Sequence, residues 1–524
     1  MRPETSDTGI EAGIEAAART SSGGSAMHAE VIETHMSVLF FYGAHVLKVR
    51  KPVSYGFADF RDPEERRADC SREVELNRRL APDVYVGTAS VLVDDRTVEH
   101  AVVMRRLPPT RNLAAIVASG EDASAELELV AEVLARFHEG ARRSPAISAS
   151  ATSDALWQRW QATEEELSRF IGTAVDGSDY RRLVSLAQRF LRGWGELFER
   201  RIATGRICDG HGDLQAADVF CLPDGPRLLD CLEFDDTLRH GDVLADAAFL
   251  VQDLERMGAD AASRSFFDAY RRSSGTDQPE ALLHFYVAAR AHVRLLVECL
   301  RLEQGLQAPA PDPSRILAQA LAHLEAAIPR LVLVGGLPGT GKSSLATWIG
   351  EQLGATVLST DHERRTDPSA PRGPSPFGSG QYTYERRRGV YEQLLQRSAA
   401  LLHDARSVVL DATWSNAEFR QLAAAVARST STTLVELECR CAPEERTRRI
   451  LARHGVEAVE SDATPAVADA LAEVADPWPT AHVVDTSGPV DLTRKAVLEV
   501  LHAEMPGHAA PMQESGRGSG QKIS

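Results

Sequence analysis

The sequence lacks the features that carry a chain into or across a membrane. No apolar run in its 524 residues approaches the ~18 residues that a membrane-spanning helix needs. Residues 1–27 are rich in Ser, Gly, Ala and Glu and contain no apolar core that could serve as a secretion signal. The cysteines are odd in number and include no C-x-x-C pair, which argues against a disulfide framework. We therefore expect a cytoplasmic protein.

An excess of positive charge is also missing. The chain has 58 Lys and Arg residues against 75 Asp and Glu residues, a formal net charge of −17. A nucleic-acid backbone must be met by local positive charge, so this balance argues against nucleic acid as the main partner. It leaves room for a basic pocket that holds a nucleotide. We expect a small-molecule partner and no membrane, and no pattern in the sequence sets an oligomeric state.

The length predicts about two to four folding units. Strand-like runs over 31–60 precede a largely helical stretch over 124–206, so a strand-led lobe is followed by a helix-rich lobe. A Pro-rich break at 307–314 indicates a domain boundary. Strands alternate with helices from residue 330, which implies a parallel sheet with right-handed crossovers. The predicted parts are a disordered tail (1–27), an α+β domain (28–315), an α/β domain (326–505) and a second disordered tail (506–524).

The clearest motif is "GLPGTGKSS", which follows an apolar strand and opens a helix. Its glycines let backbone N–H groups converge on phosphate oxygens, helped by the positive end of the helix. In this pattern the lysine holds the β- and γ-phosphates of ATP and the first serine ligates Mg²⁺. The predicted nucleotide-binding residues here are Gly336, Gly339, Gly341, Lys342, Ser343 and Ser344.

Two further strands of this unit end in a carboxylate. "SVVLDAT" places Asp411 where such folds hold an acid against the metal ion, although a helix-capping Asp would look the same. "TVLSTDHERR" ends another strand with Asp361, and Arg364 follows three residues later. Open parallel sheets bind ligands at the carboxyl ends of their strands. Asp361 could therefore accept a proton from an acceptor hydroxyl and Arg364 could hold the acceptor or the phosphate, while a helix N-cap remains the alternative for Asp361.

The stretch "EERTRRILARH" puts Arg446, Arg449 and Arg453 on one face of a helix. We interpret this helix as a lid whose cations meet the transferring phosphoryl group, with a solvated basic face as the competing interpretation. Residues 331–488 resemble small P-loop kinases, among them gluconate-kinase-like enzymes, the kinase part of polynucleotide kinases and zeta toxins. In that group the D-x-x-R pair serves the hydroxyl acceptor, which implies this role for Asp361 and Arg364.

An unrelated motif occurs earlier, at "GHGDLQAADVF". It resembles the H-G-D-x-x-x-x-N loop of aminoglycoside and choline kinase-like phosphotransferases, with Asp213 as the carboxylate that receives the hydroxyl proton. The resemblance implies that Asp218 and Asp230 bind metal. It also implies that Lys48, in "VLKVRKPV", contacts the α- and β-phosphates of ATP with Glu73 as its helix partner. Lys51 and Glu75 are the alternatives to that pair.

This first motif departs from the family at two positions, since Asp218 replaces Asn and Gln215 replaces His. A carboxylate suits Mg²⁺ at least as well as an amide does. It also adds a negative charge to the group formed by Asp213, Asp230 and Glu233, which favours either a bound cation or protonation in an inactive site. The stretch "SVLFFYGAH" has one glycine where a phosphate-covering loop often has several.

From about residue 33 to 500 the chain resembles a bacterial two-domain family. That family joins an aminoglycoside phosphotransferase-like, bilobal protein-kinase-like domain to a P-loop kinase-like ATP-binding domain. The resemblance implies an ATP- and Mg²⁺-dependent kinase that acts on a hydroxyl of a small polar metabolite, chiefly through the second domain. One alternative is a pseudokinase that regulates a nucleotide switch or slow ATPase. Another is a resistance kinase that modifies aminoglycosides.

Overall fold

The computed structural model of the chain describes residues 30–34, 36–55, 58–93, 96–275, 278–305, 312–366, 383–453 and 464–504. Within those ranges, no helix is at once long enough and apolar enough to cross a membrane. The chain forms two compact units, each built from two stretches of sequence. The first unit contains Met1–Leu156 and Arg201–Gln278, and the second contains Trp157–Arg200 and Pro279–Ser524.

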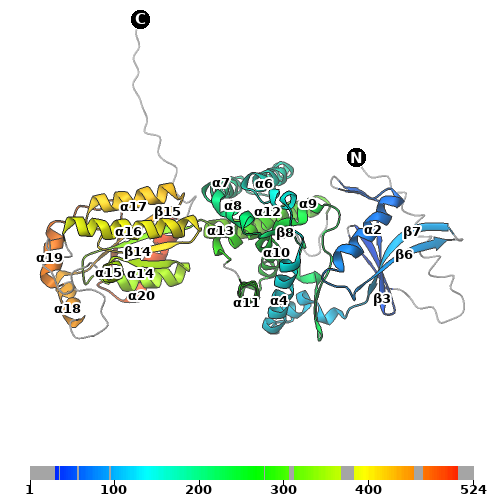
Figure 1. Cartoon of the computed structure of the whole chain (residues 1–524), viewed down its shortest axis with the longest axis horizontal. Helices are drawn as coiled ribbons and strands as arrows, with labels where there is room; N and C mark the ends of the chain where they lie inside the picture. The colour runs from blue at the N-terminus through cyan, green and yellow to red at the C-terminus, as the bar shows by residue number, and fades with distance from the viewer. Residues whose placement is uncertain are drawn as a thin grey trace, which may run out of the picture. The chain divides into compact units, whose positions relative to one another are not determined.

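The first unit contains an antiparallel five-stranded sheet in the order β1-β2-β3-β7-β6 (Figure 1). Its strands are β1 (Glu30–Glu33), β2 (Ser37–Tyr42), β3 (His45–Arg50), β6 (Tyr85–Val93) and β7 (Arg96–Arg105). The stretch "SVLFFYGAH" forms the hairpin of β2 and β3, with Tyr42 opposite His45 and Gly43 at a φ of 55°. A short pair, β4 (Ser54–Tyr55) and β5 (Ala58–Asp59), precedes the first helix.

Helix α2 (Pro63–Asn77) packs on this sheet. Asp62 caps it by accepting a hydrogen bond from Glu64 N at 2.9 Å, and Pro63 occupies the first turn, where the missing N–H has no helical partner. Its buried side chains, among them Cys70 and Val74, join Tyr85 and Val102 of the sheet, and Val84 just before β6, in one apolar cluster. This packing brings Glu73 into contact with Lys48 and Arg50 of β3.

The rest of the first unit holds the predicted catalytic segment between short strands. β8 (Ile207–Asp209) pairs with β11 (His240–Asp242), and β9 (Val219–Leu222) pairs with β10 (Gly225–Leu228). The 3-10 turn η3 (Ala216–Asp218) leads into β9, while η1 (Pro109–Arg111) precedes α3. The helices are α3 (Leu113–Ser119), α4 (Ser124–Gly140), α5 (Pro145–Ala149), α9 (Asp236–Arg239), α10 (Val243–Arg256) and α11 (Asp260–Ser273).

The second unit contains a parallel five-stranded sheet in the order β13-β14-β12-β15-β16. The strands are β12 (Arg330–Gly335), β13 (Thr356–Ser359), β14 (Val408–Asp411), β15 (Thr433–Arg440) and β16 (His482–Asp485). The helices around it are α14 (Lys342–Leu353), α15 (Thr360–Thr366), α16 (Tyr384–His403), α17 (Ala417–Ser429), α18 (Pro443–Arg453), α19 (Pro465–Glu473) and α20 (Val490–Ala503).

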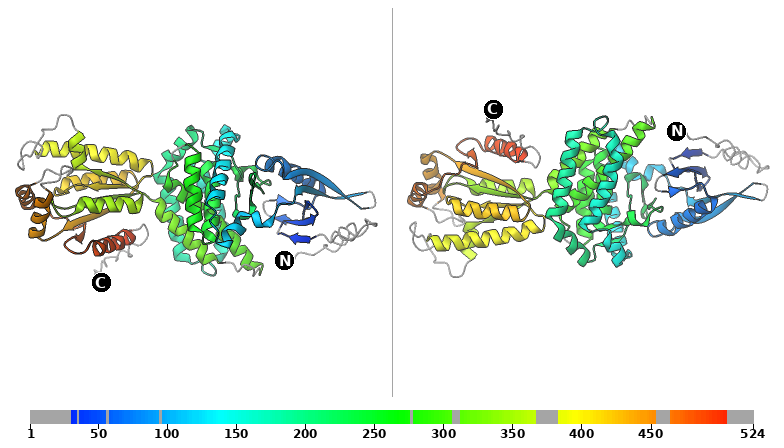
Figure 2. Two further views of the ribbon diagram at one scale, coloured as in Figure 1. Left: turned by 90° about the horizontal axis from the view of Figure 1, so that it is seen from below. Right: turned by 90° about the horizontal axis from the view of Figure 1, so that it is seen from above.

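Helices cover both faces of this sheet (Figures 1 and 2). Leu331 and Leu333 of β12 point to a core shared with α16 and α17. Val332 and Val334 point to the opposite core, shared with α14 and α20. Because both faces are buried, the strand reads as a continuous apolar run instead of alternating. The ligand-binding edge is therefore the one where the parallel strands end.

The second unit also holds long helices that precede the parallel sheet in sequence. They are α6 (Ser153–Leu167, from Trp157 onward), α7 (Gly177–Gly193), most of α8 (Gly195–Ala203), α12 (Glu280–Glu303) and α13 (Pro313–Ala327), with η2 (Ser168–Phe170) after α6. Stacked aromatic rings join them, such as Phe190 on Phe285 at 4.9 Å between centroids. The two sheets agree with the predicted fold class, since an α+β part precedes a parallel-sheet α/β part.

Candidate functional site

The glycine-rich loop lies between the end of β12 and the start of α14. Gly336, Gly339 and Gly341 all have a left-handed φ, at 138°, 86° and 85°. A Cβ on Gly336 would lie 2.6 Å from the Cys439 carbonyl oxygen, and one on Gly339 would lie 2.7 Å from the Arg446 carbonyl oxygen. Only glycine fits both the backbone and the space.

The first turn of α14 completes this loop. Lys342 begins the helix directly after Gly341 and is 9% exposed. Ser343 and Ser344 follow and are exposed. The free N–H groups and the positive end of the helix dipole at this point attract an anion. The backbone, the lysine and the helix end together form a phosphate-binding arrangement.

Asp411 lies at the end of β14, beside this loop. It is paired in register with Val334 of β12 on one side and with Ser359 of β13 on the other. Its side chain is 7% exposed. The buried Asp411 carboxylate and the Ser343 hydroxyl, in the first turn of α14, are hard oxygen donors of the kind that Mg²⁺ takes. These two residues fit a magnesium ion, which would neutralise charge on the phosphate oxygens.

Asp361 and Arg364 lie together on α15, which starts where β13 ends. An Arg364 Nη1 donates to Asp361 Oδ1 at 3.0 Å, and both side chains are mostly buried. The next acid on the helix, Glu363, is buried and pairs with Arg397 of α16. The predicted D-x-x-R pair therefore exists as an ion pair, at the strand end next to that of Asp411.

Helix α18 packs on the phosphate loop through its backbone and through Arg449. The Arg449 guanidinium donates to the Thr486 carbonyl at 2.8 Å and to Glu445 at 2.6 Å. Thr486 in turn donates from its hydroxyl to the Thr340 carbonyl of the loop at 2.6 Å. Arg446 instead pairs with Asp469 of α19 at 2.5 Å. Arg453 ends the helix, and its side chain lies outside the described residues.

In the first unit, Asp213 follows β8 on a loop that α10 holds in place. The carboxylate of Asp246 accepts hydrogen bonds from His211 N at 2.6 Å and Gly212 N at 2.9 Å. The buried His211 ring has a lowered pKa because burial disfavours its charge, and its Nε2 lies 2.9 Å from the Leu229 carbonyl. Gln215 donates to Asp213 Oδ2 at 3.0 Å, so the residue that replaces the family's His contacts the predicted base.

Lys48 lies between two carboxylates. Its Nζ is 2.9 Å from Glu73 and 2.6 Å from Asp230. Burial opposes the charge of this ammonium, but Asp230 and Glu73 more than offset it and raise its pKa. Lys48 in turn lowers the pKa of Asp230. The structure therefore pairs Lys48 with Glu73, the lysine and the glutamate that the family resemblance implied.

Lys51 and Glu75, the alternatives to that pair, have other partners. Lys51 pairs with Glu33 on β1. Glu75 is 72% exposed and lies 3.5 Å from Arg72 on its own helix.

Asp218 completes a cluster of carboxylates with Asp213 and Asp230. Burial, followed by the negative charges of Asp230 and Asp213, raises the pKa of Asp218 well above its ordinary value. Asp213 and Asp218 are half-buried and the Asp230 side chain is 50% exposed, and carboxylates that repel one another in this way are donors that a divalent cation neutralises. These residues fit Mg²⁺, which would neutralise phosphate charge in this unit as well.

Glu233 belongs to a different group of acids, and sequence reasoning missed its partner. Arg50 of β3 contacts Asp69 at 2.5 Å, Glu73 at 3.2 Å, and Glu233. These three carboxylates lie close enough to suggest a metal site, but the Arg50 guanidinium already contacts each of them. Arg50 is two residues from Lys48 on the same strand, so both face Glu73. That spacing was the one signal available in the sequence.

Two families of known domains match the chain. The phosphotransferase enzyme family matches residues 48–286, and the AAA domain family matches residues 331–478. Both domains are of kinase type, which supports a phosphotransferase, and a P-loop kinase domain implies nucleotide binding.

Two mycobacterial proteins match nearly the whole chain. They are the uncharacterized protein Rv2004c of Mycobacterium tuberculosis and the uncharacterized protein Mb2027c of Mycobacterium bovis. Each is 41% identical over 466 residues, which is 88% of this chain and 93% of the relative. The chain therefore belongs to the bacterial two-domain family that joins an aminoglycoside phosphotransferase-like domain to a P-loop kinase-like domain.

Solved structures show similarity to each part at low identity. A choline/ethanolamine kinase family protein from Mesorhizobium loti is 14% identical, with a TM-score of 0.38, over 60% of this chain and 94% of its own. The Mycobacterium tuberculosis APS kinase CysC, in complex with AMPPNP and APS, is 21% identical. Its TM-score is 0.26, over 33% of this chain and 98% of its own.

Proposed function

We propose that the chain is an ATP- and Mg²⁺-dependent kinase that phosphorylates a hydroxyl of a small polar metabolite, with its main activity in the parallel-sheet part of the second unit. The carrying observation is the loop of three left-handed glycines that ends in the buried Lys342, beside Asp411 at the end of the neighbouring strand. Phosphoryl transfer depends mostly on alignment and charge neutralisation, and this edge offers both.

The residues of the second unit divide the work by position. Loop N–H groups and Lys342 would bind the phosphates, and Ser343 and Asp411 would hold the metal ion. Asp361 would accept the proton of the acceptor hydroxyl, and Arg364, 3.0 Å away, would orient that carboxylate and meet the acceptor or the phosphate. Arg449 would approach the nucleotide from α18.

A comparison of ATP consumption by the full-length chain and its variants tests this proposal. The acceptors are sugars, amino sugars, aminoglycosides and nucleosides. With its acceptor, the wild type should turn over at roughly 1–100 per second. Lys342→Ala should abolish most of that turnover because the phosphates lose their cation. Asp361→Asn should lower the acceptor-dependent rate by about 10²–10⁴-fold, the usual contribution of a general base.

A matched control keeps the same chemical change away from the site. Asp404→Asn removes a carboxylate in the same part of the chain, where it forms a half-exposed pair with Arg200 at 2.7 Å. That variant should turn over like the wild type. Near-normal turnover by Lys342→Ala, or no response to any acceptor, would reject a kinase in the second unit.

A second candidate function concerns the first unit. The stretch predicted to cover the phosphates is a tight β2–β3 hairpin, whose Ala44 carbonyl accepts from Arg106 N at 2.7 Å. Lys48 is held by Glu73 and Asp230. The tight hairpin favours a nucleotide-binding pseudokinase that regulates the second unit, whereas the Lys48–Glu73 pair is one that a working kinase also has. The Asp213→Asn variant decides whether the first unit is a pseudokinase or a catalyst. If this variant loses a separate acceptor-dependent activity, the first unit is catalytic.

A further inference from the structure

The end of α2 contacts the site of the first unit at two separate segments. Glu73, the partner of Lys48, lies in the last part of this helix. Asn77 ends the helix and is fully buried, and Arg79 follows two residues later with its side chain 26% exposed. None of the roles assigned above uses Asn77 or Arg79.

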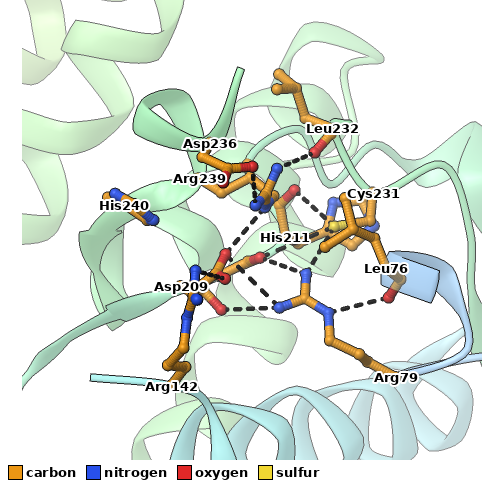
Figure 3. A network of polar contacts seen from close by, with 12 residues as sticks. Leu76, Arg79, Arg142, Asp209, His211, Cys231, Leu232, Asp236, Arg239 and His240 are labelled. Carbon is orange, nitrogen blue, oxygen red and sulfur yellow. Dashed lines mark hydrogen bonds and ion pairs between the residues drawn. The ribbon is translucent and has the colours of Figure 1, made fainter. Parts of the chain in front are cut away.

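Arg79 bridges the two segments with one guanidinium (Figure 3). It donates to the carbonyl oxygens of Asp209 at 3.1 Å and Gly210 at 2.9 Å, directly before the loop that carries Asp213. Nη2 of the same group lies 2.9 Å from the sulfur of Cys231, the residue after Asp230. The planar fork of a guanidinium can reach several acceptors in fixed directions, which a lysine cannot do.

The position of Arg79 is itself fixed from several sides. Its Nε donates to the Leu76 carbonyl at 2.9 Å, and its guanidinium lies over the Phe137 ring at 5.0 Å from the centroid. Asp209 lies 3.6 Å from it and also binds Arg239 at 2.9 Å (Figure 3). The bridge therefore has little freedom to move.

Asn77 holds the second segment through its backbone. Its Oδ1 accepts from Cys231 N at 2.8 Å, and its Nδ2 donates to the Glu73 carbonyl at 2.9 Å. Asp230 has a left-handed φ of 60°, which is uncommon for a residue other than glycine. The Tyr85 hydroxyl accepts from Asp230 N at 3.2 Å, so contacts on both sides hold this conformation in place.

We propose that Asn77 and Arg79 are positioning residues of the first unit. They set the separation between the loop that presents Asp213 and the segment that presents Asp230, and so the affinity of the carboxylate cluster for a divalent cation with its nucleotide. They act through the backbone and touch no ligand, as outer-shell partners of metal sites do. The inference rests on metal binding by the first unit and is independent of catalysis by Lys342 and Asp361.

The test measures cation binding in the full-length chain that carries Lys342→Ala, which silences the phosphate loop of the second unit. Mn²⁺ replaces Mg²⁺ as the probe, and electron paramagnetic resonance counts bound Mn²⁺ with a non-hydrolysable ATP analogue present. Arg79→Met should weaken Mn²⁺ binding by about 10–100-fold, the usual effect of removing an outer-shell partner. Arg79→Lys should weaken it less, because an ammonium keeps part of the contact with Gly210.

Arg66 provides the matched control on the same helix. It is 3% exposed, binds Glu99 at 2.7 Å and donates to the Phe60 carbonyl at 2.6 Å, away from both segments. Arg66→Met should lower the thermal unfolding midpoint and leave Mn²⁺ affinity unchanged.

Three results would overturn the inference. They are parental affinity in Arg79→Met, equal losses in Arg66→Met and Arg79→Met, and no Mn²⁺ binding by the parent. If Arg79→Met does not fold, parental affinity in Arg79→Lys would overturn it, and a weakened affinity would support it. ATP consumption by the chain with Lys342 intact reports separately on the proposed kinase.

Discussion

At the scale of single residues, Asp218 is where the first unit departs most from its family. Burial and the charges of Asp230 and Asp213 disfavour its ionised form. We expect Asp218→Asn to remove this repulsion and to raise the unfolding midpoint of the metal-free chain by about 2–4 °C. The same change removes a carboxylate donor, so Mn²⁺ affinity should fall about tenfold. Calorimetry without metal and Mn²⁺ titration measure the two effects.

Asp224→Asn is the control for this prediction. Asp224 lies on the turn between β9 and β10, is 67% exposed and pairs with Arg227 at 2.8 Å. Its loss should change neither quantity. A lower midpoint in metal-free Asp218→Asn, or tighter Mn²⁺ binding, would contradict the view that this carboxylate is repelled by its neighbours and used by the cation.

His292 of the second unit gives a residue-scale prediction on pH. The ring stacks on Trp160 at 4.2 Å between centroids and contacts the Tyr180 hydroxyl at 2.8 Å, and burial lowers its pKa to about 3. Between that value and the ordinary 6.5, the unfolded chain holds a proton that the folded chain does not. Stability should therefore fall as pH drops below 6.5, by up to about 1.4 kcal/mol per pH unit for this one proton.

Chemical unfolding at pH 7 and pH 5 measures this slope. His292→Gln keeps a polar partner for Tyr180 and removes the titration, so its slope should be shallower. His403→Gln, at an exposed position, should leave the slope as it is. A full slope in His292→Gln would place the responsible proton on another group.

At the scale of elements, the phosphate loop depends on glycine for steric reasons. Gly336→Ala would put a Cβ 2.6 Å from the Cys439 carbonyl oxygen at a φ of 138°, so the loop must shift. We expect the Gly336→Ala variant to show no measurable nucleotide binding in the second unit when it is titrated by calorimetry. Gly389→Ala, in the open middle of α16, should keep binding and stabilise the chain by about 0.5–1 kcal/mol. Equal binding by both variants would show that the loop tolerates a side chain and does not grip phosphate.

The sequence could predict those features of the two sites whose residues are neighbours in the chain. The loop of the second unit was predictable because its strand, glycines and lysine are neighbours in sequence, and the alternating pattern after residue 330 indicated the parallel sheet. Lys48 and Glu73 followed from resemblance. Arg50, Asn77 and Arg79 did not, because their partners lie far away in sequence and an arginine near a helix end is usually a solvated charge. The left-handed φ of Asp230 likewise depends on tertiary contacts and has no local signal.

At the scale of the whole molecule, each unit carries its own cation and carboxylates that we propose to face phosphate and to hold a metal ion, so the chain should bind two nucleotides. With Mg²⁺ and a non-hydrolysable ATP analogue, calorimetric titration should show two sites in the wild type. Lys342→Ala and Asp230→Asn should each retain one, and the double variant none. Saturation at 100 times Kd should stabilise the unit that binds by about 2.7 kcal/mol, and chelation of Mg²⁺ should reverse this. If the wild type shows a single site, and Lys342→Ala abolishes it while Asp230→Asn does not, the first unit does not bind nucleotide. The carboxylates around Asp230 would then have a structural role only.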